Sequence, residues 1–335
     1  MKDALFYEKL PGDIVQCRLC ARECKINDGR SGFCTVRENV KGVLYTKAYA
    51  NPVAVQVDPI EKKPLYHFLP GSSTFSIATA GCNFRCKFCQ NWEISQRDEG
   101  FGSILSEEEF SPADIVKEAV QNNCQSISYT YTEPTIFYEY AYDIARMARP
   151  AGLRNIFVTN GYMTQESLDF ISGYLDAANV DLKFFSEDSY RDLCQASMAP
   201  VLNTIKRMKK LNIWVEVTTL VIPGFNDSEK ELSAIANFIS GIDRDIPWHI
   251  SAFHPAFRMG DCIVTPQGTL RAAKEIGERV GLNFVYAGNV YGWGGETVCP
   301  SCKRTIIRRD GFAIKEYNMS GERCINCRQA IPGVF

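Results

Sequence analysis

Through the middle of the chain, short apolar runs alternate with segments in which apolar residues recur at helical spacing. Such short runs are typical of buried strands, and the longer periodic segments are typical of helices. Repeated strand–helix units add parallel strands to one sheet, which becomes either a doubly wound sheet or a barrel. The expected strands are residues 74–80, 126–132, 155–159, 178–184, 213–221, 248–253 and 283–287.

Two features favour a barrel. The units number roughly seven, and polar residues gather at the ends of several strands, as in barrel enzymes. No expected strand is followed by G-x-G-x-x-G, the phosphate-binding turn of a dinucleotide-binding sheet. We therefore predict an α/β fold with a partial, TIM-like (β/α)6–7 barrel over residues 71–295. It would lie between an N-terminal four-cysteine module with its lead-in, residues 1–70, and a C-terminal four-cysteine ribbon, residues 296–335.

Composition changes this picture mainly through the cysteines. With 45% hydrophobic residues and a net charge of −2, the chain is globular and lacks the basic excess of a protein that wraps nucleic acid. The N-terminus has no apolar signal-peptide core, and no run of about 18 apolar residues could cross a bilayer. We therefore expect a cytoplasmic protein without a membrane partner. Disulfides are rare in that compartment, so the eleven cysteines that fall into three groups are expected to hold metal, whereas Cys124, Cys194 and Cys262 stand alone.

The central group follows the first expected strand and reads Cys82-x3-Cys86-x2-Cys89. Three thiolates in one tight loop can converge on a cuboidal [4Fe–4S] cluster and leave its fourth iron without a protein ligand. An open coordination position marks a reactive metal site rather than a structural one. The alternative is a three-cysteine zinc site completed by His67 or by a more distant ligand.

The two outer groups each offer four thiolates. Cys299-x2-Cys302 and Cys324-x2-Cys327, separated by 21 residues, have the spacing of a zinc-ribbon or rubredoxin-like knuckle pair, for which we favour zinc. Residues 305–317 between them can form a hairpin that turns at Asp310-Gly311. The N-terminal group is Cys17-x2-Cys20-x3-Cys24-x9-Cys34. Its spacing fits zinc or an auxiliary [4Fe–4S] cluster, and we lean towards zinc.

The central loop, with Phe88 before its last cysteine, resembles the radical S-adenosylmethionine (radical SAM) superfamily. The resemblance implies that SAM chelates the open iron and that one electron from the cluster cleaves it to methionine and a 5′-deoxyadenosyl radical. This radical would abstract hydrogen from a substrate. A one-electron reductant of the flavodoxin or ferredoxin type is implied as a partner.

The same resemblance assigns cofactor contacts at later strand ends. Thr132-Glu133-Pro134 stands where the superfamily has G-G-E-P, with Tyr131 and Thr132 in place of the glycines, so Glu133 resembles the residue that receives the SAM ammonium. Thr159-Asn160-Gly161 resembles a ribose-contacting turn, and Asp181-Leu182-Lys183 is similar to the D-x-K motif of pyruvate formate-lyase activating enzymes. The implied SAM contacts are Phe88, Thr132, Glu133, Asn160, Asp181 and Lys183.

Residues 58–71 and 89–96 resemble one branch of the superfamily, the AmmeMemoRadiSam radical SAM proteins. That resemblance implies Memo-like and AMMECR-like proteins as partners and leaves the reaction unnamed. Two other functions stay open, namely activation of a glycyl-radical enzyme and a non-catalytic zinc-binding interaction module. The weak charge argues against nucleic acid as the partner of the ribbon.

Some further residues have two interpretations. Glu61, Lys62, Lys63 and His67 either line a substrate pocket or form a salt-bridged lead-in to the barrel, which we prefer. His249 is expected to be a packed strand residue.

Overall fold

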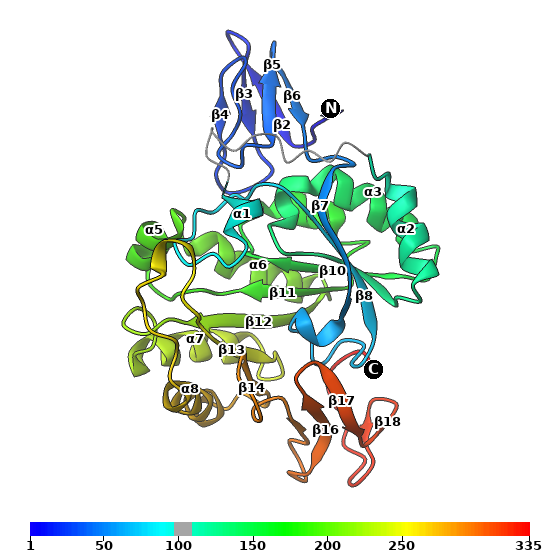
Figure 1. The fold of residues 1–335 in the computed structure, drawn as a ribbon, viewed down its shortest axis with the longest axis vertical. Helices are drawn as coiled ribbons and strands as arrows, with labels where there is room; N and C mark the ends of the chain where they lie inside the picture. The colour runs from blue at the N-terminus through cyan, green and yellow to red at the C-terminus, as the bar shows by residue number, and fades with distance from the viewer. Residues whose placement is uncertain (97–108) are drawn as a thin grey trace.

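The computed structural model describes residues 1–96 and 109–335. A central sheet of eight strands carries a small β module at each end of the molecule's long axis (Figure 1). The strand order is β14-β13-β12-β11-β10-β9-β8-β7, and neighbours from β8 to β14 are parallel. Because β7 and β14 are the two edges, the sheet is an open, partial barrel.

All seven expected strands are present in this sheet. Two of them end early, since Tyr131 turns the chain with φ of 62° and the Leu182 N–H bonds back to the Val180 carbonyl. The seven strands are β8 (Ser73–Thr79), β9 (Ser126–Tyr129), β10 (Arg154–Thr159), β11 (Ala177–Asp181), β12 (Trp214–Val221), β13 (Trp248–Ala252) and β14 (Val285–Gly288).

Strand β7 (Pro52–Pro59) was not expected from the sequence. It pairs antiparallel with β8, so a segment that we assigned to the N-terminal unit belongs to the central sheet. After β7 a short 3₁₀ helix, η1 (Ile60–Lys62), leads back to β8. The alternation of β7 is weak, with intermediate burial at half of its positions, which is why a periodicity argument misses it.

Helices cover the sheet between its strands. Helix α2 starts with a reciprocal capping box, in which Ser111 and Asp114 satisfy each other's backbone N–H groups. The helices are α1 (Trp92–Ser95), α2 (Pro112–Gln121), η2 (Pro134–Phe137), α3 (Tyr138–Ala148), α4 (Gln165–Ile171), α5 (Glu187–Cys194), α6 (Ala199–Lys210), α7 (Glu229–Ile242), η3 (Phe257–Met259) and α8 (Gln267–Val280). Within the described ranges, no helix has the length and apolar character needed to span a bilayer.

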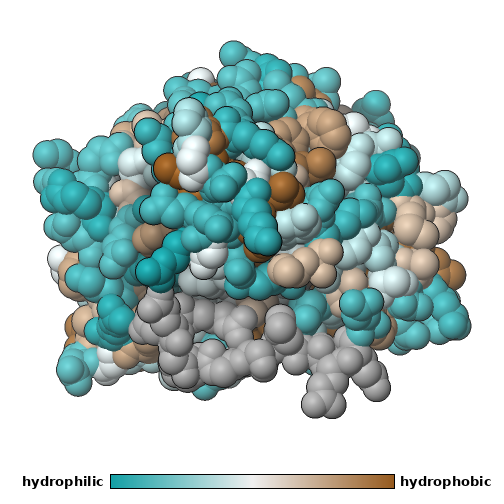
Figure 2. Space-filling view, turned by 90° about the horizontal axis from the view of Figure 1, so that it is seen from above, coloured by the Kyte–Doolittle hydropathy of each residue, from teal (hydrophilic) through white to brown (hydrophobic). Residues whose placement is uncertain are grey.

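The N-terminal module consists of two small antiparallel sheets, ordered β1-β6-β5 and β2-β3-β4. It sits over one side of the barrel, and the face seen from above is mostly hydrophilic (Figure 2). Buried Arg37 joins it to the barrel through an ion pair of 2.9 Å with Glu139 of α3. Its strands are β1 (Lys2–Asp3), β2 (Tyr7–Leu10), β3 (Ile14–Cys17), β4 (Lys25–Ile26), β5 (Arg37–Val40) and β6 (Val43–Thr46).

The C-terminal module is a hairpin ribbon below the opposite side of the barrel (Figure 1). The hairpin predicted over residues 305–317 is present, with Gly311 at φ of 57° in its turn. The strands are β15 (Thr297–Val298), β16 (Thr305–Asp310), β17 (Ala313–Tyr317), β18 (Met319–Ser320) and β19 (Arg323–Cys324).

A buried polar network holds this ribbon to the barrel. Arg309 approaches Glu61 at 3.4 Å, and the His67 ring contacts the Pro332 carbonyl at 2.7 Å and the Tyr286 hydroxyl at 2.6 Å. Lys63 pairs with Asp58 at 2.6 Å. The lead-in residues therefore have structural partners, as our preferred interpretation stated, and His67 is not available to complete the central cysteine group.

Candidate functional site

The central cysteine loop leaves the sheet at the end of β8. Gly81 makes the turn with φ of 98°, and a Cβ atom there would lie 2.6 Å from the carbonyl oxygen of Cys34 in the N-terminal module. Only glycine suits both the conformation and the close approach. The loop that follows buries Cys86, while Cys82 and Cys89 are partly exposed.

Backbone contacts from distant elements hold the loop in place. The Arg85 N–H donates to the Cys194 carbonyl at 3.0 Å and the Lys87 N–H donates to the Leu193 carbonyl at 2.9 Å, both at the end of α5. This places the Cys194 thiol beside Cys86. Cys194 has no other cysteine near it in the sequence, so no sequence pattern predicts this contact, which depends on how α5 packs on the barrel.

The environment of the three thiols disfavours free thiolates. Burial raises the pKa of Cys82 and of Cys89, whereas the Cys194 thiol, followed by burial, raises the pKa of Cys86. A bound metal is the cation that would stabilise the deprotonated sulfurs. Ser95, which our sequence argument did not use, places its hydroxyl 3.1 Å from the Cys89 sulfur.

The expected charged pair lies beside this loop. Lys183 Nζ is 2.8 Å from Asp181 Oδ2 and 5.8 Å from the centre of the Phe88 ring. Burial opposes the charge of Lys183, but the Asp181 carboxylate and the Cys86 sulfur raise its pKa well above the ordinary value. Lys183 is thus a fixed cation next to the cysteine loop, with a partly exposed carboxylate as its partner.

Glu133, which the resemblance makes a SAM contact, is buried at the end of the neighbouring strands. Its carboxylate is 1% exposed and accepts hydrogen bonds from Thr135, the Thr159 hydroxyl and the Asn160 N–H. The side chain therefore holds the turn after β10. Asn160, the residue it positions, places its amide nitrogen 3.9 Å from the Cys82 sulfur.

Tyr131 occupies a glycine-like conformation with φ of 62°. A non-glycine residue in this region costs roughly 1 kcal/mol or more unless its surroundings hold it there. Its hydroxyl donates to Asp58, the Lys63 ammonium lies 4.6 Å above its ring, and Asn91 donates to its carbonyl at 2.8 Å. Thr132 turns inward and donates to the Thr79 carbonyl at 2.8 Å. The segments 58–71 and 89–96 thus meet at Tyr131, which stands where the superfamily motif has a glycine.

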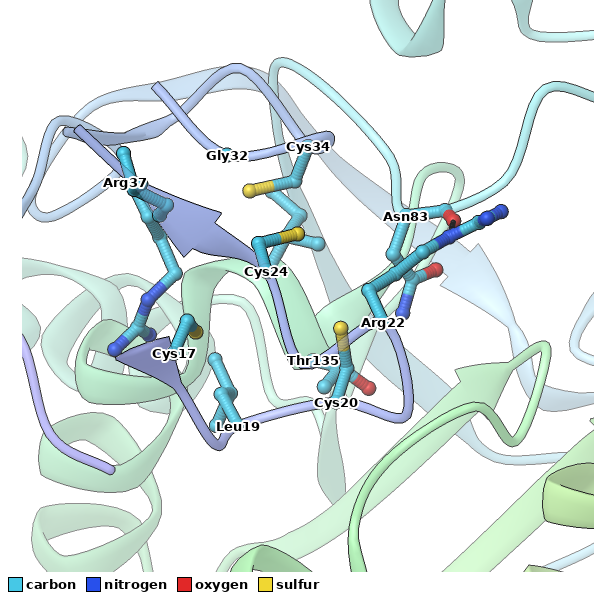
Figure 3. A pocket seen from close by; sticks show the side chains of 12 residues that line it. Cys17, Leu19, Cys20, Arg22, Cys24, Gly32, Cys34, Arg37, Asn83 and Thr135 are labelled. Carbon is cyan, nitrogen blue, oxygen red and sulfur yellow. Dashed lines mark hydrogen bonds between the residues drawn. The ribbon is translucent and has the colours of Figure 1, made fainter. Parts of the chain in front are cut away.

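The outer cysteine groups differ in geometry. Among the described residues, Cys299, Cys302, Cys324 and Cys327 form a compact set, with all four sulfurs within 4.8 Å of one another. Against the opposing effect of burial, N–H donors at Cys327 and Asn326 lower the pKa of Cys324 to about 6. The N-terminal four instead surround a pocket, shown in Figure 3.

The donor set of the central loop fits an iron–sulfur cluster with one open iron. Cys82, Cys86 and Cys89 would hold it, and among the described residues their sulfurs do not form the compact set that a single ion needs. Residues 76–236 match the radical SAM superfamily profile.

The chain belongs to the radical SAM superfamily.

This membership rests on sequence relatives as well as on the site. An uncharacterized protein of Methanocaldococcus jannaschii is 44% identical over 341 residues, covering all of both chains. The pyruvate formate-lyase 1-activating enzyme of Escherichia coli K12 is 21% identical over 194 residues, covering 54% of this chain and 76% of that enzyme. The solved radical SAM methyltransferase of Sphaerobacter thermophilus has the same fold, with a TM-score of 0.51, 15% identity and 71% of each chain covered. The protein is therefore a radical SAM-type enzyme.

Proposed function

We propose that this radical SAM enzyme reductively cleaves SAM at a [4Fe–4S] cluster held by Cys82, Cys86 and Cys89, and that the resulting 5′-deoxyadenosyl radical abstracts hydrogen from a substrate. The observation that carries this proposal is the convergence of the cysteine loop with the Asp181–Lys183 pair at one end of the parallel strands. Catalytic groups of barrel enzymes gather at this end.

The surrounding residues support a binding role for SAM. Asp181 and Lys183 present opposite charges that match the zwitterionic methionyl end of SAM. Asn160 lies beside Cys82, where an amide can donate to a cosubstrate or to a cluster sulfur. Phe88 is buried, with the Lys183 ammonium 5.8 Å from the centre of its ring, and would contact SAM from this side. Glu133 would receive the SAM ammonium, as the resemblance to the superfamily implies, while its carboxylate also accepts from the Asn160 N–H.

The first test is the formation of 5′-deoxyadenosine by anaerobically reconstituted protein with a strong reductant. The Cys86→Ala variant should lose this product by about 10³-fold or more, because the cluster loses a ligand. Cys124→Ala is the matched control, since Cys124 is also buried but precedes β9, at the opposite end of the strands. Equal product from the wild type and Cys86→Ala would overturn the proposal.

We propose Memo-like and AMMECR-like proteins as partners of this enzyme. The alternative is activation of a glycyl-radical enzyme, which the similarity to pyruvate formate-lyase activating enzymes and the Asp181–Lys183 pair favour. Candidate partners containing deuterated glycine separate the two. Deuterium should appear in 5′-deoxyadenosine for glycyl activation, while transfer only from partners deuterated at other residues would exclude it.

We also propose that the compact C-terminal set holds zinc. A tetrahedral zinc with Zn–S bonds of about 2.3 Å places its sulfurs about 3.8 Å apart. The sulfur pairs Cys299–Cys327 and Cys302–Cys324 are 3.6 and 3.8 Å apart. Metal analysis of the purified protein should find about one zinc per chain, lost in Cys324→Ala. Iron in place of zinc at this set would contradict the assignment.

A further inference from the structure

Four cysteines of the N-terminal module enclose a cavity that our zinc preference does not explain. Cys17, Cys20, Cys24 and Cys34 line a pocket with about 330 Å³ of empty space, part of it open to solvent. Figure 3 shows their side chains arranged around this space and coming from separate turns of the chain. Cys17, Cys20 and Cys34 are at most 9% exposed, so the pocket lies within the fold.

The spacing of the sulfurs separates this site from a zinc site. A single zinc draws four sulfurs into contact with one another, as the C-terminal set shows. Among the residues that the structure describes, the N-terminal four do not form such a compact set, and neither do Cys82, Cys86 and Cys89. In a cuboidal cluster each thiolate binds a different iron, so the sulfurs stand apart around a central volume.

Unpartnered donors point to an occupant of this cavity. The Nε–H of Arg37, a residue only 2% exposed, is buried without an acceptor, and Arg37 lines the pocket beside Cys17 (Figure 3). Asn83 also lines the pocket, is fully buried, and has an amide Nδ2 without an acceptor. Buried N–H groups are costly when unpaired, and the sulfurs of a cluster are the acceptors they would meet.

The cavity adjoins the central cysteine loop. Asn83, which follows Cys82, forms part of the pocket wall, and Arg22 of the module donates to its carbonyl at 2.9 Å. The Asn83 side chain accepts from Asn160 at 2.7 Å, and Asn160 in turn reaches Cys82. Cys34 packs its carbonyl against Gly81. Residues on both sides of Cys82 therefore touch the N-terminal site.

We propose that Cys17, Cys20, Cys24 and Cys34 hold a second [4Fe–4S] cluster that delivers the electron for SAM cleavage to the central one. Four thiolates occupy all four irons, which suits electron transfer rather than substrate binding. One electron from a flavodoxin- or ferredoxin-type reductant would reduce this cluster from the 2+ to the 1+ state. Passing that electron to the central cluster would return it to 2+. The relay role rests on the proposed function, whereas the identity of the metal does not.

Iron counting tests the identity independently of activity. The reconstituted wild type should contain about eight irons and one zinc per chain. A variant with Cys82, Cys86 and Cys89 all changed to Ala should keep about four irons with the Mössbauer signature of a [4Fe–4S] cluster. Cys20→Ala/Cys24→Ala should lose the other four, and Cys324→Ala should lose zinc alone. The proposal would be overturned if the variant without Cys82, Cys86 and Cys89 contained no iron, or if zinc were found at the N-terminal cysteines. Both results can be obtained even if Cys20→Ala/Cys24→Ala does not fold.

The relay is tested by the rate at which the central cluster is reduced, followed by electron paramagnetic resonance. Reduced flavodoxin is compared with titanium(III) citrate, a small reductant that needs no docking site. In Cys20→Ala/Cys24→Ala the flavodoxin rate should fall at least about tenfold relative to the citrate rate. An unchanged ratio would exclude the relay. Failure of the wild type to cleave SAM with either reductant would instead refute the proposed function and leave the iron count standing.

Discussion

The four-cysteine sites at the two ends of the chain use the same ligand type in different surroundings. The C-terminal four gather on a short hairpin with sulfurs in contact, and Cys327 is exposed. The N-terminal four lie apart around a pocket whose wall includes residues of the barrel, among them Asn83 and Thr135. The ribbon can close around one ion by itself, whereas the N-terminal site is completed by the central cysteine loop. Both groups have four thiols, so their different metal-binding roles are better inferred from their position relative to the barrel than from the number of thiols.

The two ends are similar in one respect: in each module a buried arginine forms an ion pair with the barrel or its lead-in. Arg37 pairs with Glu139 at 2.9 Å in the N-terminal module, and Arg309 pairs with Glu61 at 3.4 Å in the ribbon. Both arginines donate in addition to main-chain carbonyls, those of Leu5 and Tyr66 respectively. Attachment to the barrel is thus similar at the two ends, and the difference between them lies in the metal sites.

The largest expected effect follows from removing the zinc of the C-terminal four-cysteine site, which should affect that end of the chain alone. Structural zinc contributes about 10 kcal/mol or more to the folding of small domains. Cys324→Ala should therefore unfold residues 296–335, which limited proteolysis would detect as early cleavage in this segment. The iron content should persist, because none of the cysteines proposed to bind iron lies in residues 296–335. Loss of iron in this variant would show that the two ends do not behave independently.

The sequence predicted the seven parallel strands, the hairpin of the ribbon and the proximity of Asp181 and Lys183, because local periodicity and strand ends determine these features. It missed β7, whose burial does not alternate clearly, and it did not predict that the Glu133 carboxylate holds the backbone N–H of Asn160. The Cys194–Cys86 neighbourhood and the shared wall at Asn83 depend on long-range packing. The spacing of residues along the sequence does not predict such contacts.

The next effect tests whether the two arginine anchors are equivalent. Arg37→Met and Arg309→Met should each destabilise the protein by about 3–5 kcal/mol, because each leaves a buried carboxylate without its cation. Urea unfolding measures the loss. Adding Glu139→Gln to Arg37→Met, or Glu61→Gln to Arg309→Met, should recover much of it by removing the uncompensated charge. Surface pairs such as Arg191 with Asp188 serve as controls, and disruption of that pair should cost under about 1 kcal/mol.

The smallest expected effect is a loss of stability at low pH, which should affect the C-terminal ribbon before the N-terminal module. The three histidines are His67, His249 and His254, and none lies in the N-terminal module. Burial lowers the pKa of His67 from 6.5 to about 4 in the folded protein, so the unfolded chain binds more protons between these values. Stability is therefore full above pH 6.5 and falls as the pH drops towards 4, by about 2 kcal/mol at pH 5.

Urea unfolding at pH 7 and pH 5 measures this loss. The difference between the two pH values should shrink by about 2 kcal/mol in His67→Gln and stay unchanged in His254→Gln, whose histidine is exposed. Carboxylates and cysteine thiols titrate in all three proteins, so their contributions cancel in the comparison. Proteolysis at pH 5 should accordingly reach the ribbon before the N-terminal module. An equal pH dependence in the wild type and His67→Gln would mean that the folded and unfolded chains bind the same number of protons at His67, so that burial does not lower the pKa of its ring.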